Sequence, residues 1–249
     1  KLMRYLILTD IHANLEALET VLADATERGY QQTLVLGDLV GYGADPNAVV
    51  ERVQGLKPLA IVRGNHDKVA CGIDQAEGFN AVARHAARWT LEQLTPDYRE
   101  WLASLPEGPH DVDDLLQICH GSPFDEDAYI FDELDAVRAL KVSSRPVCLF
   151  GHTHYPISFE LSDDAFETIG PPFTADTELD FKIGSKYLIN PGSVGQPRDG
   201  DPRAAYAIAD SGKRRIEMFR LDYALEEAQQ KVIKAGLPEV LAQRLAVGR

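Results

Sequence analysis

Five separate stretches of the chain carry residue types that bind metal ions, and each follows an apolar run typical of a β-strand. The candidate ligands are aspartate, asparagine and histidine, and a glycine flanks four of the five stretches. Carboxylate and imidazole ligands suit Mn²⁺, Fe, Zn²⁺, Co²⁺ and Ni²⁺. In chain order the stretches are Asp10-Ile11-His12, Gly37-Asp38-Leu39-Val40-Gly41, Gly64-Asn65-His66-Asp67, His120-Gly121 and Gly151-His152-Thr153-His154.

These stretches hold more candidate ligands than one ion can use, since an ion offers about four to six positions. If the stretches are extended, alternate side chains point to the same side, so Asp10 and His12 can reach one centre. His152 and His154 have the same spacing. Two ions that share one carboxylate would use all the ligands, and such ions, about 3.5–4 Å apart, clamp a phosphoryl group during in-line displacement. The predicted chemistry is therefore hydrolysis of phosphate esters.

Each stretch taken alone has an ordinary explanation as a turn or a helix N-cap. It is the occurrence of all five at the ends of predicted strands that favours a metal site. Three other residues fall outside the pattern. His85 lies in a predicted helix and His110 opens a predicted strand, so we expect both to be structural or solvated. Cys119 points away from the face that His120 uses, so we expect it in the core.

The elements that must position these residues alternate between strand and helix over the first 66 residues. Apolar residues in 14–28 recur at three- and four-residue spacing, which predicts a helix, and Pro46 marks the first turn of a second one. Short apolar runs at 5–8, 33–36 and 59–62 predict three strands. This order predicts parallel strands with right-handed crossovers, and ligands bind beyond the carboxyl ends of such strands.

The rest of the chain contains helices, further strands and one long loop. We expect helices in 76–105 and again from residue 222, and a long loop or irregular hairpin at 162–186. The first of these segments and the loop are predicted to shape the substrate pocket. No linker separates two complete cores, so we predict a single domain over 1–249, with two stacked sheets and helices outside. The remaining predicted strands are 115–119, 147–150, 187–189, and a closing hairpin of 204–209 with 215–219.

Composition narrows the class of protein. The 249 residues are 45% hydrophobic and 26% charged, which is typical of a globular protein. The formal net charge of −14 disfavours a stable nucleic-acid partner, although bound cations can invert the field locally. No apolar run reaches about 18 residues, so we expect no membrane partner. Three widely spaced cysteines and no signal peptide predict a cytoplasmic protein. The partner we expect is a small phosphate-ester substrate, and a homo-oligomer is left open.

In this order the motifs resemble those of the calcineurin-like metallophosphoesterase superfamily, in particular its compact bacterial and archaeal phosphodiesterase-type branch. The motifs span residues 10–154, and the likeness extends to Asn-Pro-Gly-Ser-Val-Gly-Gln-Pro-Arg at 190–198. The resemblance implies an α/β fold, a four-layer αββα sandwich of two stacked mixed sheets flanked by helices.

The resemblance also implies roles for single residues. It implies two divalent ions, with Mn²⁺ expected first and Fe, Zn²⁺, Ni²⁺ or Co²⁺ as alternatives, and attack on phosphorus by a hydroxide that bridges them. His66 would protonate the leaving group, and Asp67 would orient its ring. The implied ligands are Asp10, His12, Asp38 and His154 for the first ion, and Asp38, Asn65, His120 and His152 for the second.

One departure from the family pattern affects the substrate. Protein Ser/Thr phosphatases and the related diadenosine tetraphosphate hydrolases carry an arginine shortly after the Gly-Asp motif, and residues 41–46 contain none. Arg63 and Arg198 are the candidates for phosphate contacts instead. We favour hydrolysis of phosphodiesters or phosphomonoesters. The alternatives are those two enzyme types and a catalytically silent interaction scaffold of the same fold. A metallo-β-lactamase-like hydrolase is discounted, because its His-x-His-x-Asp-His motif is missing.

Overall fold

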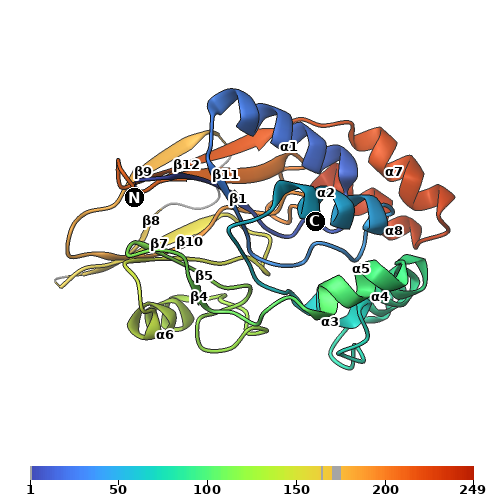
Figure 1. Cartoon of the computed structure of the whole chain (residues 1–249), viewed down its shortest axis with the longest axis horizontal. Helices are drawn as coiled ribbons and strands as arrows, with labels where there is room; N and C mark the ends of the chain where they lie inside the picture. The colour runs from blue at the N-terminus through green and yellow to red at the C-terminus, as the bar shows by residue number, and fades with distance from the viewer. Residues whose placement is uncertain (1, 164, 170–174) are drawn as a thin grey trace.

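The computed structural model describes residues 2–163, 165–169 and 175–249, and it contains two six-stranded sheets that face each other (Figure 1). The first sheet has the order β3 (Ala60–Ile61), β2 (Gln32–Val35), β1 (Arg4–Leu8), β11 (Ala204–Asp210), β12 (Arg215–Leu221) and β9 (Thr177–Asp180). The second has the order β4 (His110–Asp111), β5 (Leu116–Ile118), β6 (Val147–Leu149), β10 (Lys186–Asn190), β7 (Ile157–Leu161) and β8 (Phe166–Ile169).

Helices cover the outer faces of both sheets, which gives the predicted four-layer αββα sandwich (Figure 1). Helix α1 lies over the first sheet and α6 under the second, while the other helices gather toward one end of the sandwich. The helices are α1 (Leu15–Arg28), α2 (Pro46–Leu56), α3 (Asn65–Ala70), α4 (Ala81–Gln93), α5 (Pro96–Ala103), α6 (Glu133–Val142), α7 (Leu225–Lys234) and α8 (Glu239–Val247). None of the helices among the described residues is long and apolar enough to cross a membrane.

The alternation of side chains along the strands explains the layers. In β1, Leu6 and Leu8 pack under α1 and α2, whereas Tyr5 and Ile7 face the second sheet. The strand β6 divides in the same way, since Val147 and Leu149 face the first sheet and Cys148 packs toward α6. Successive side chains of a strand point to opposite faces, so a strand that is apolar throughout must be covered on both sides.

The strands that carry the candidate ligands run parallel, as predicted. β1 pairs in parallel with β2, and β2 with β3. In the second sheet β5, β6 and β10 are also parallel neighbours. Their carboxyl ends therefore lie at one edge of each sheet. The antiparallel strands β11, β12 and β7 complete the sheets and make both of them mixed.

The segment 162–186 differs from the expected loop. It contains β8, which pairs with β7, and β9, which pairs with β12 in the other sheet. The register places Asp180 beside Arg215, at the end of the sheet where β1 begins. At its other end the segment places Ile169 of β8 beside Ser158, which pairs with Ile189 near the carboxyl end of β10, so its contribution to the substrate pocket stays a prediction. Its acidic residues hid two edge strands, and 164 and 170–174 lie outside the described residues.

The stability of the protein should depend on the buried side chains of β1, the strand that leads to Asp10. Leu8 is 0% exposed and packs in the core under α1. We expect Leu8→Ala to lower the free energy of unfolding by about 2–5 kcal/mol, the usual effect of a buried leucine cavity. Urea denaturation of the metal-free protein measures it. A loss below about 1 kcal/mol would contradict this packing.

Candidate metal centre

The structure brings the seven predicted metal ligands together at the carboxyl ends of the strands. They form two groups of ligand atoms, each within 4.8 Å of one another, and the side chains that define the groups are buried. Asn65 joins the second group, since its Oδ1 lies 3.2 Å from Nε2 of His120. The first group is Asp10, His12, Asp38 and His154, and the second is Asp38, His120 and His152.

In the first group, two imidazole nitrogens face each other at close range. Nε2 of His12 lies 3.0 Å from Nε2 of His154. The Oδ1 atom of Asp10 lies 3.4 Å from His154 Nε2 and 3.9 Å from His12 Nε2. These atoms converge on a common point, as the ligands of a single ion do.

The second group repeats this arrangement. Nε2 of His120 lies 3.1 Å from Nδ1 of His152. The Asp38 carboxylate lies between the groups, because its Oδ2 is 3.5 Å from His12 Nε2 and 3.4 Å from His120 Nε2. Asp38 therefore occupies the place of a carboxylate that is shared by two centres.

The opposite nitrogens of the four histidines show whether this site fits a cation. Each of them meets a backbone carbonyl, which can only accept, so each of these nitrogens must carry the proton. The inward nitrogens of neutral rings then present lone pairs, which is the usual arrangement of metal-binding histidines. The pairs are His12 Nδ1 with Val40 at 3.0 Å, His120 Nδ1 with Leu36 at 2.8 Å, His154 Nδ1 with Gln196 at 2.6 Å, and His152 Nε2 with Asp127 at 3.1 Å.

The pKa shifts of the ligand histidines and of Asp10 are those of a buried site that a cation would stabilise. Burial lowers the pKa of His12 and His154 well below the usual value, and that of His152 to about 3. His120 is also buried, but the charge of Asp38 raises its pKa to about 10. Burial raises the pKa of Asp10 to about 7. Divalent cations would relieve this crowding, because they favour neutral imidazoles and ionised carboxylates, and this donor set binds metal in proteins.

The backbone around the ligands is unusual and differs from the expected extended geometry. Asp10, His12, Asp38, His152 and His154 have φ values of 51°, 49°, 53°, 68° and 58°. The strands end at Leu8 and Leu149, so the Asp-x-His and His-x-His spacings work through left-handed turns. Non-glycine residues in this region are strained, and such strain gathers at functional sites. Glycine is needed at Gly64, where an added Cβ would lie 2.1 Å from Asp38 Oδ1.

His66, the predicted catalytic histidine, lies beside the ligands without joining either group. Its ring contacts those of Tyr42 and Phe79, with centroid distances of 4.4 and 4.6 Å. Burial lowers its pKa to about 4, while Asp38 acts in the opposite direction. Its Nδ1 has no hydrogen-bond partner among the described residues. This position suits a group that exchanges a proton with a bound substrate.

The carboxylate of Asp67 binds backbone amides of the ligand loops. Its Oδ1 accepts from the amides of Leu39 at 2.9 Å and Val40 at 3.3 Å, and its Oδ2 accepts from that of Gly64 at 2.9 Å. Both oxygens thus accept from the backbone, and no hydrogen bond joins Asp67 to the ring of His66 among the described residues, so its role in orienting that ring stays a prediction. Because α3 begins at Asn65, Asp67 points back toward the helix start and ties two ligand loops together.

Of the two arginines predicted to bind substrate, Arg198 lies at the site and Arg63 does not. Arg63 forms two hydrogen bonds with Glu126, of 2.9 and 2.8 Å, and pairs with Glu107 at 3.4 Å. It therefore supports a neighbouring loop and is not directed at the metal ligands. The backbone amide of Arg198 donates to His154 O, and its guanidinium lies 5.7 Å from the ring centroid of Tyr42. Its charge acts on Asp10, His12 and His66, so it belongs to the site.

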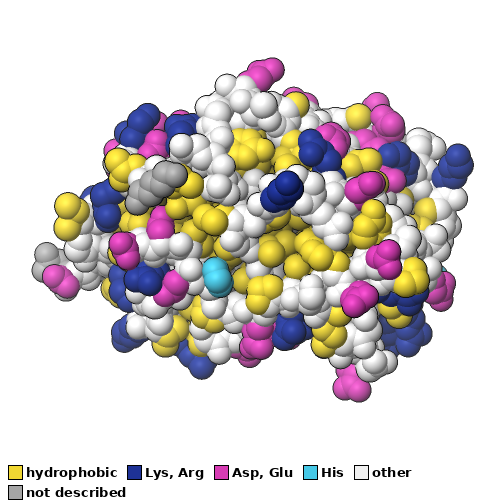
Figure 2. Space-filling model, in the orientation of Figure 1, with side chains coloured by type: hydrophobic (Ala, Val, Ile, Leu, Met, Phe, Trp, Pro, Cys, Tyr) yellow, Lys and Arg dark blue, Asp and Glu magenta, His cyan; other side chains and the backbone are white. Residues whose placement is uncertain are grey.

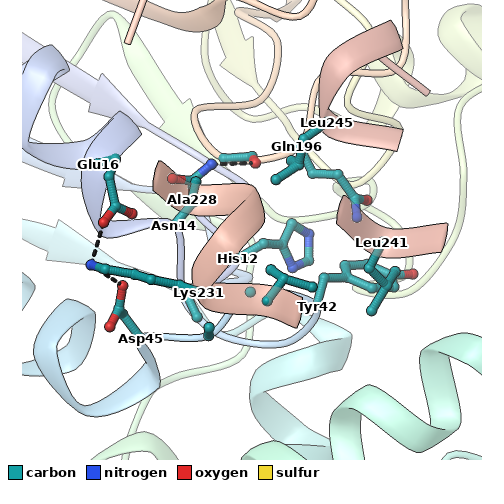
Figure 3. Close-up of a pocket in the computed structure, with 15 residues that line it drawn as sticks. His12, Asn14, Glu16, Tyr42, Asp45, Gln196, Ala228, Lys231, Leu241 and Leu245 are labelled. Atoms are coloured by element: carbon teal, nitrogen blue, oxygen red, sulfur yellow. Dashed lines mark hydrogen bonds and ion pairs between the residues drawn. The ribbon is translucent and has the colours of Figure 1, made fainter. Parts of the chain in front are cut away.

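Sequence reasoning missed the aromatic residues of the site and the contribution of the C-terminal helices. Figure 3 shows a cavity behind His12 and Tyr42 that α7 and α8 enclose. There Lys231 of α7 pairs with Asp45 at 2.8 Å and also with Glu16, which fixes the helix over the first ligand group (Figure 3). The only sequence signal was Gly41-Tyr42-Gly43, which places an aromatic side chain directly after the Gly-Asp motif.

The fold and the site together define a metal-binding α/β phosphoesterase. A family model, the calcineurin-like phosphoesterase superfamily domain, matches residues 3–214. The chain belongs to this superfamily. It is 36% identical over 253 residues to the protein MJ0912 of Methanocaldococcus jannaschii, covering 98% of this chain and 97% of that protein. It is 26% identical over 219 residues to phosphodiesterase YfcE of Escherichia coli, covering 84% and 89%.

Solved structures agree with this assignment. A metallophosphoesterase from Sphaerobacter thermophilus is 39% identical, with a TM-score of 0.86 and coverage of 100% of both chains. The protein PH1004 from Pyrococcus horikoshii has a TM-score of 0.78 at 20% identity, covering 99% of this chain and 98% of its own, and shows the same fold.

Single substitutions should separate the two ligand groups. We expect His12→Ala to remove one bound ion and His152→Ala the other, whereas Asp38→Ala should weaken both because its carboxylate lies between them. Elemental analysis after equilibration with Mn²⁺ measures the ions per chain. The exposed His85→Ala is the matched control and should bind as the unchanged protein does. If all three ligand variants lost both ions to the same extent, the two groups would not bind separate ions.

The role of Asp67 can be tested through stability. Asp67→Asn keeps the shape of the side chain but removes one of two acceptor oxygens from buried amides. We expect the free energy of unfolding to fall by about 1–3 kcal/mol, the effect of leaving a buried donor without a partner. Urea denaturation of the metal-free protein measures it against Asp114→Asn, an exposed control. Equal stability of the two variants would show that these hydrogen bonds are dispensable.

Proposed function

We propose that this protein hydrolyses phosphate esters with two divalent ions, and acts on phosphodiesters in preference to monoesters. The observation that carries the proposal is the position of Asp38, whose Oδ2 lies between two groups of inward-facing nitrogen atoms. Family membership and the similarity to phosphodiesterase YfcE support the same class of reaction. Mn²⁺ is the ion we propose first, because mixed oxygen and imidazole ligands suit it.

Two ions held at these ligands would polarise a phosphoryl oxygen and activate water for attack on phosphorus. Arg198 is placed to bind a further phosphoryl oxygen, since its charge acts on Asp10, His12 and His154 of the first ligand group and on His66. Tyr42 and Phe79 hold the His66 ring and exclude water from it. A bound phosphate anion adds negative charge near this ring and raises its pKa, so His66 can hold a proton for the leaving oxygen.

The charges around the site favour a monoanionic substrate. A phosphodiester carries one negative charge, whereas a monoester carries up to two at neutral pH. Two cations near the site are already neutralised, because Arg63 pairs with Glu126 and Lys68 pairs with Glu126 and Asp127 at 3.0 and 2.5 Å. Arg198 is left as the cation that acts on the ligands. We therefore place phosphodiesters ahead of monoesters.

The distribution of surface charge indicates whether a nucleic acid could be the substrate (Figure 2). On the face that Figure 2 shows, Lys and Arg side chains alternate with Asp and Glu, and the described residues form no continuous basic stripe there. Nucleic acid is held mainly through phosphate contacts from such cations. This supports a small phosphate ester as substrate. A silent scaffold would not need the complete set of ligands together with His66, so we do not propose it.

The direct test is hydrolysis of bis-p-nitrophenyl phosphate by the Mn²⁺-loaded protein. We expect release of p-nitrophenol that disappears on chelation and returns on addition of Mn²⁺, and a lower rate with p-nitrophenyl phosphate. No release from either compound with two ions bound would overturn the proposed function. A higher rate with the monoester would overturn the preference for diesters.

His66 should separate chemistry from metal binding. We expect His66→Ala to keep both ions, because the ring belongs to neither ligand group. Its kcat should fall about 10²–10⁴-fold on an alkyl phosphodiester, whose leaving oxygen needs a proton, and less on bis-p-nitrophenyl phosphate. Steady-state kinetics with both substrates and elemental analysis provide the readouts. Unchanged kcat on the alkyl ester would rule out His66 as the proton donor.

A further inference from the structure

A loop between β5 and α6 places an aromatic stack directly on a metal ligand. The ring of Tyr129 stacks on that of His152, with centroids 3.8 Å apart and planes 23° apart. On its other side Tyr129 stacks on Phe131, at 4.8 Å and 11°. Two nearly parallel partners at these distances must occupy opposite faces of the ring. Tyr129 is therefore clamped, and its hydroxyl is held in one direction.

The same loop is anchored on both sides of the second ligand group. Asp127 O accepts from Nε2 of His152, and the Asp127 carboxylate pairs with Lys68 of α3 at 2.5 Å. Glu126 joins this network through Lys68 and Arg63. Tyr129 thus lies two residues after Asp127, which is held to His152 and to Lys68.

Tyr129 lies against the second ligand group, within reach of the charged residues of the site. Burial raises its pKa, Arg198 acts in the opposite direction, and Asp38 and Asp10 raise the pKa further, so these charged groups all lie within electrostatic reach. The residue is 41% exposed, and its hydroxyl has no hydrogen-bond partner among the described residues. The hydroxyl is therefore free to donate to a bound substrate.

We propose that Tyr129 is a further catalytic residue, whose hydroxyl donates a hydrogen bond to a phosphoryl oxygen of the substrate. The proposal rests on the proposed function, because it places the phosphoryl group between the two ligand groups and Arg198. Tyr129 approaches from the side of His152, whereas His66 and Tyr42 lie on the side of His12. The substrate would then be held from two sides, with a neutral donor that suits the single charge of a phosphodiester.

The test is Tyr129→Phe, which keeps the stacking ring and removes only the hydroxyl. We expect two bound Mn²⁺ ions per chain, as in the unchanged protein, by elemental analysis. We also expect kcat/KM for bis-p-nitrophenyl phosphate to fall about tenfold, the effect of one lost neutral hydrogen bond. Calorimetric titration should show weaker binding of inorganic phosphate by a similar factor. Tyr98→Phe, in α5, is the matched control and should leave all three quantities unchanged.

Two outcomes would overturn the proposal. Unchanged kcat/KM and unchanged phosphate binding in Tyr129→Phe would show that the hydroxyl does not touch the phosphoryl group. Loss of a bound ion would show that Tyr129 acts only by positioning His152. The phosphate titration keeps this test apart from the proposed function, because it needs no turnover. If the unchanged protein binds phosphate but hydrolyses neither nitrophenyl ester, the proposed function fails while the hydrogen bond remains measurable.

Discussion

Nitrogen lone pairs and carboxylate charges that converge around the buried carboxylate of Asp38 repel one another unless positive charge lies among them. The structure makes this convergence unavoidable, because backbone carbonyls fix the proton of each ligand histidine on the outward nitrogen. A proton can neutralise one position, as the raised pKa of His120 indicates. Two divalent ions would neutralise all of them, and they would make Asp38 a shared ligand.

The fold keeps the ligand side chains close together although their charges and lone pairs repel one another. Parallel strands in both sheets end at the same edge, so ligands from both sheets can meet there. The backbone then turns through positive φ at Asp10, Asp38 and His152, conformations that few side chains adopt. Asp67 ties the loop after β2 to the start of α3 through three amides, which keeps Asp38 and His66 together. The strain at the site is thus supported by hydrogen bonds outside it.

Much of the fold and most of the site could be predicted from sequence because both follow from local patterns. Apolar alternation and helical spacing identified the βαβ units, and the five motifs identified the side chains that the structure brings together. What could not be predicted depended on tertiary contacts. The edge strands β8 and β9 are polar, so hydrophobic periodicity did not reveal them. The sequence around Arg63 does not indicate its ion pair with Glu126, because Glu126 belongs to a loop that is distant in the chain. Asp67 lies next to His66 in sequence, but a helical turn directs it to the backbone.

The aromatic side of the site was equally invisible in the sequence. Tyr129 and Phe131 stand in an irregular loop, and only the structure places their stack on His152. Tyr42 and Phe79 are far apart in the chain, yet both contact the ring of His66. Residues of this kind have no motif, because their role depends on position and not on ligand chemistry. Because these rings lie beside the metal ligands and His66, the substrate preference should depend on them.

The central claim is that two cations share the Asp38 carboxylate, and anomalous diffraction from crystals grown with Mn²⁺ tests it most directly. The account predicts two anomalous peaks about 3.5–4 Å apart, one beside His12 and His154 and one beside His120 and His152, with Asp38 between them. A single peak, or peaks away from these side chains, would contradict it.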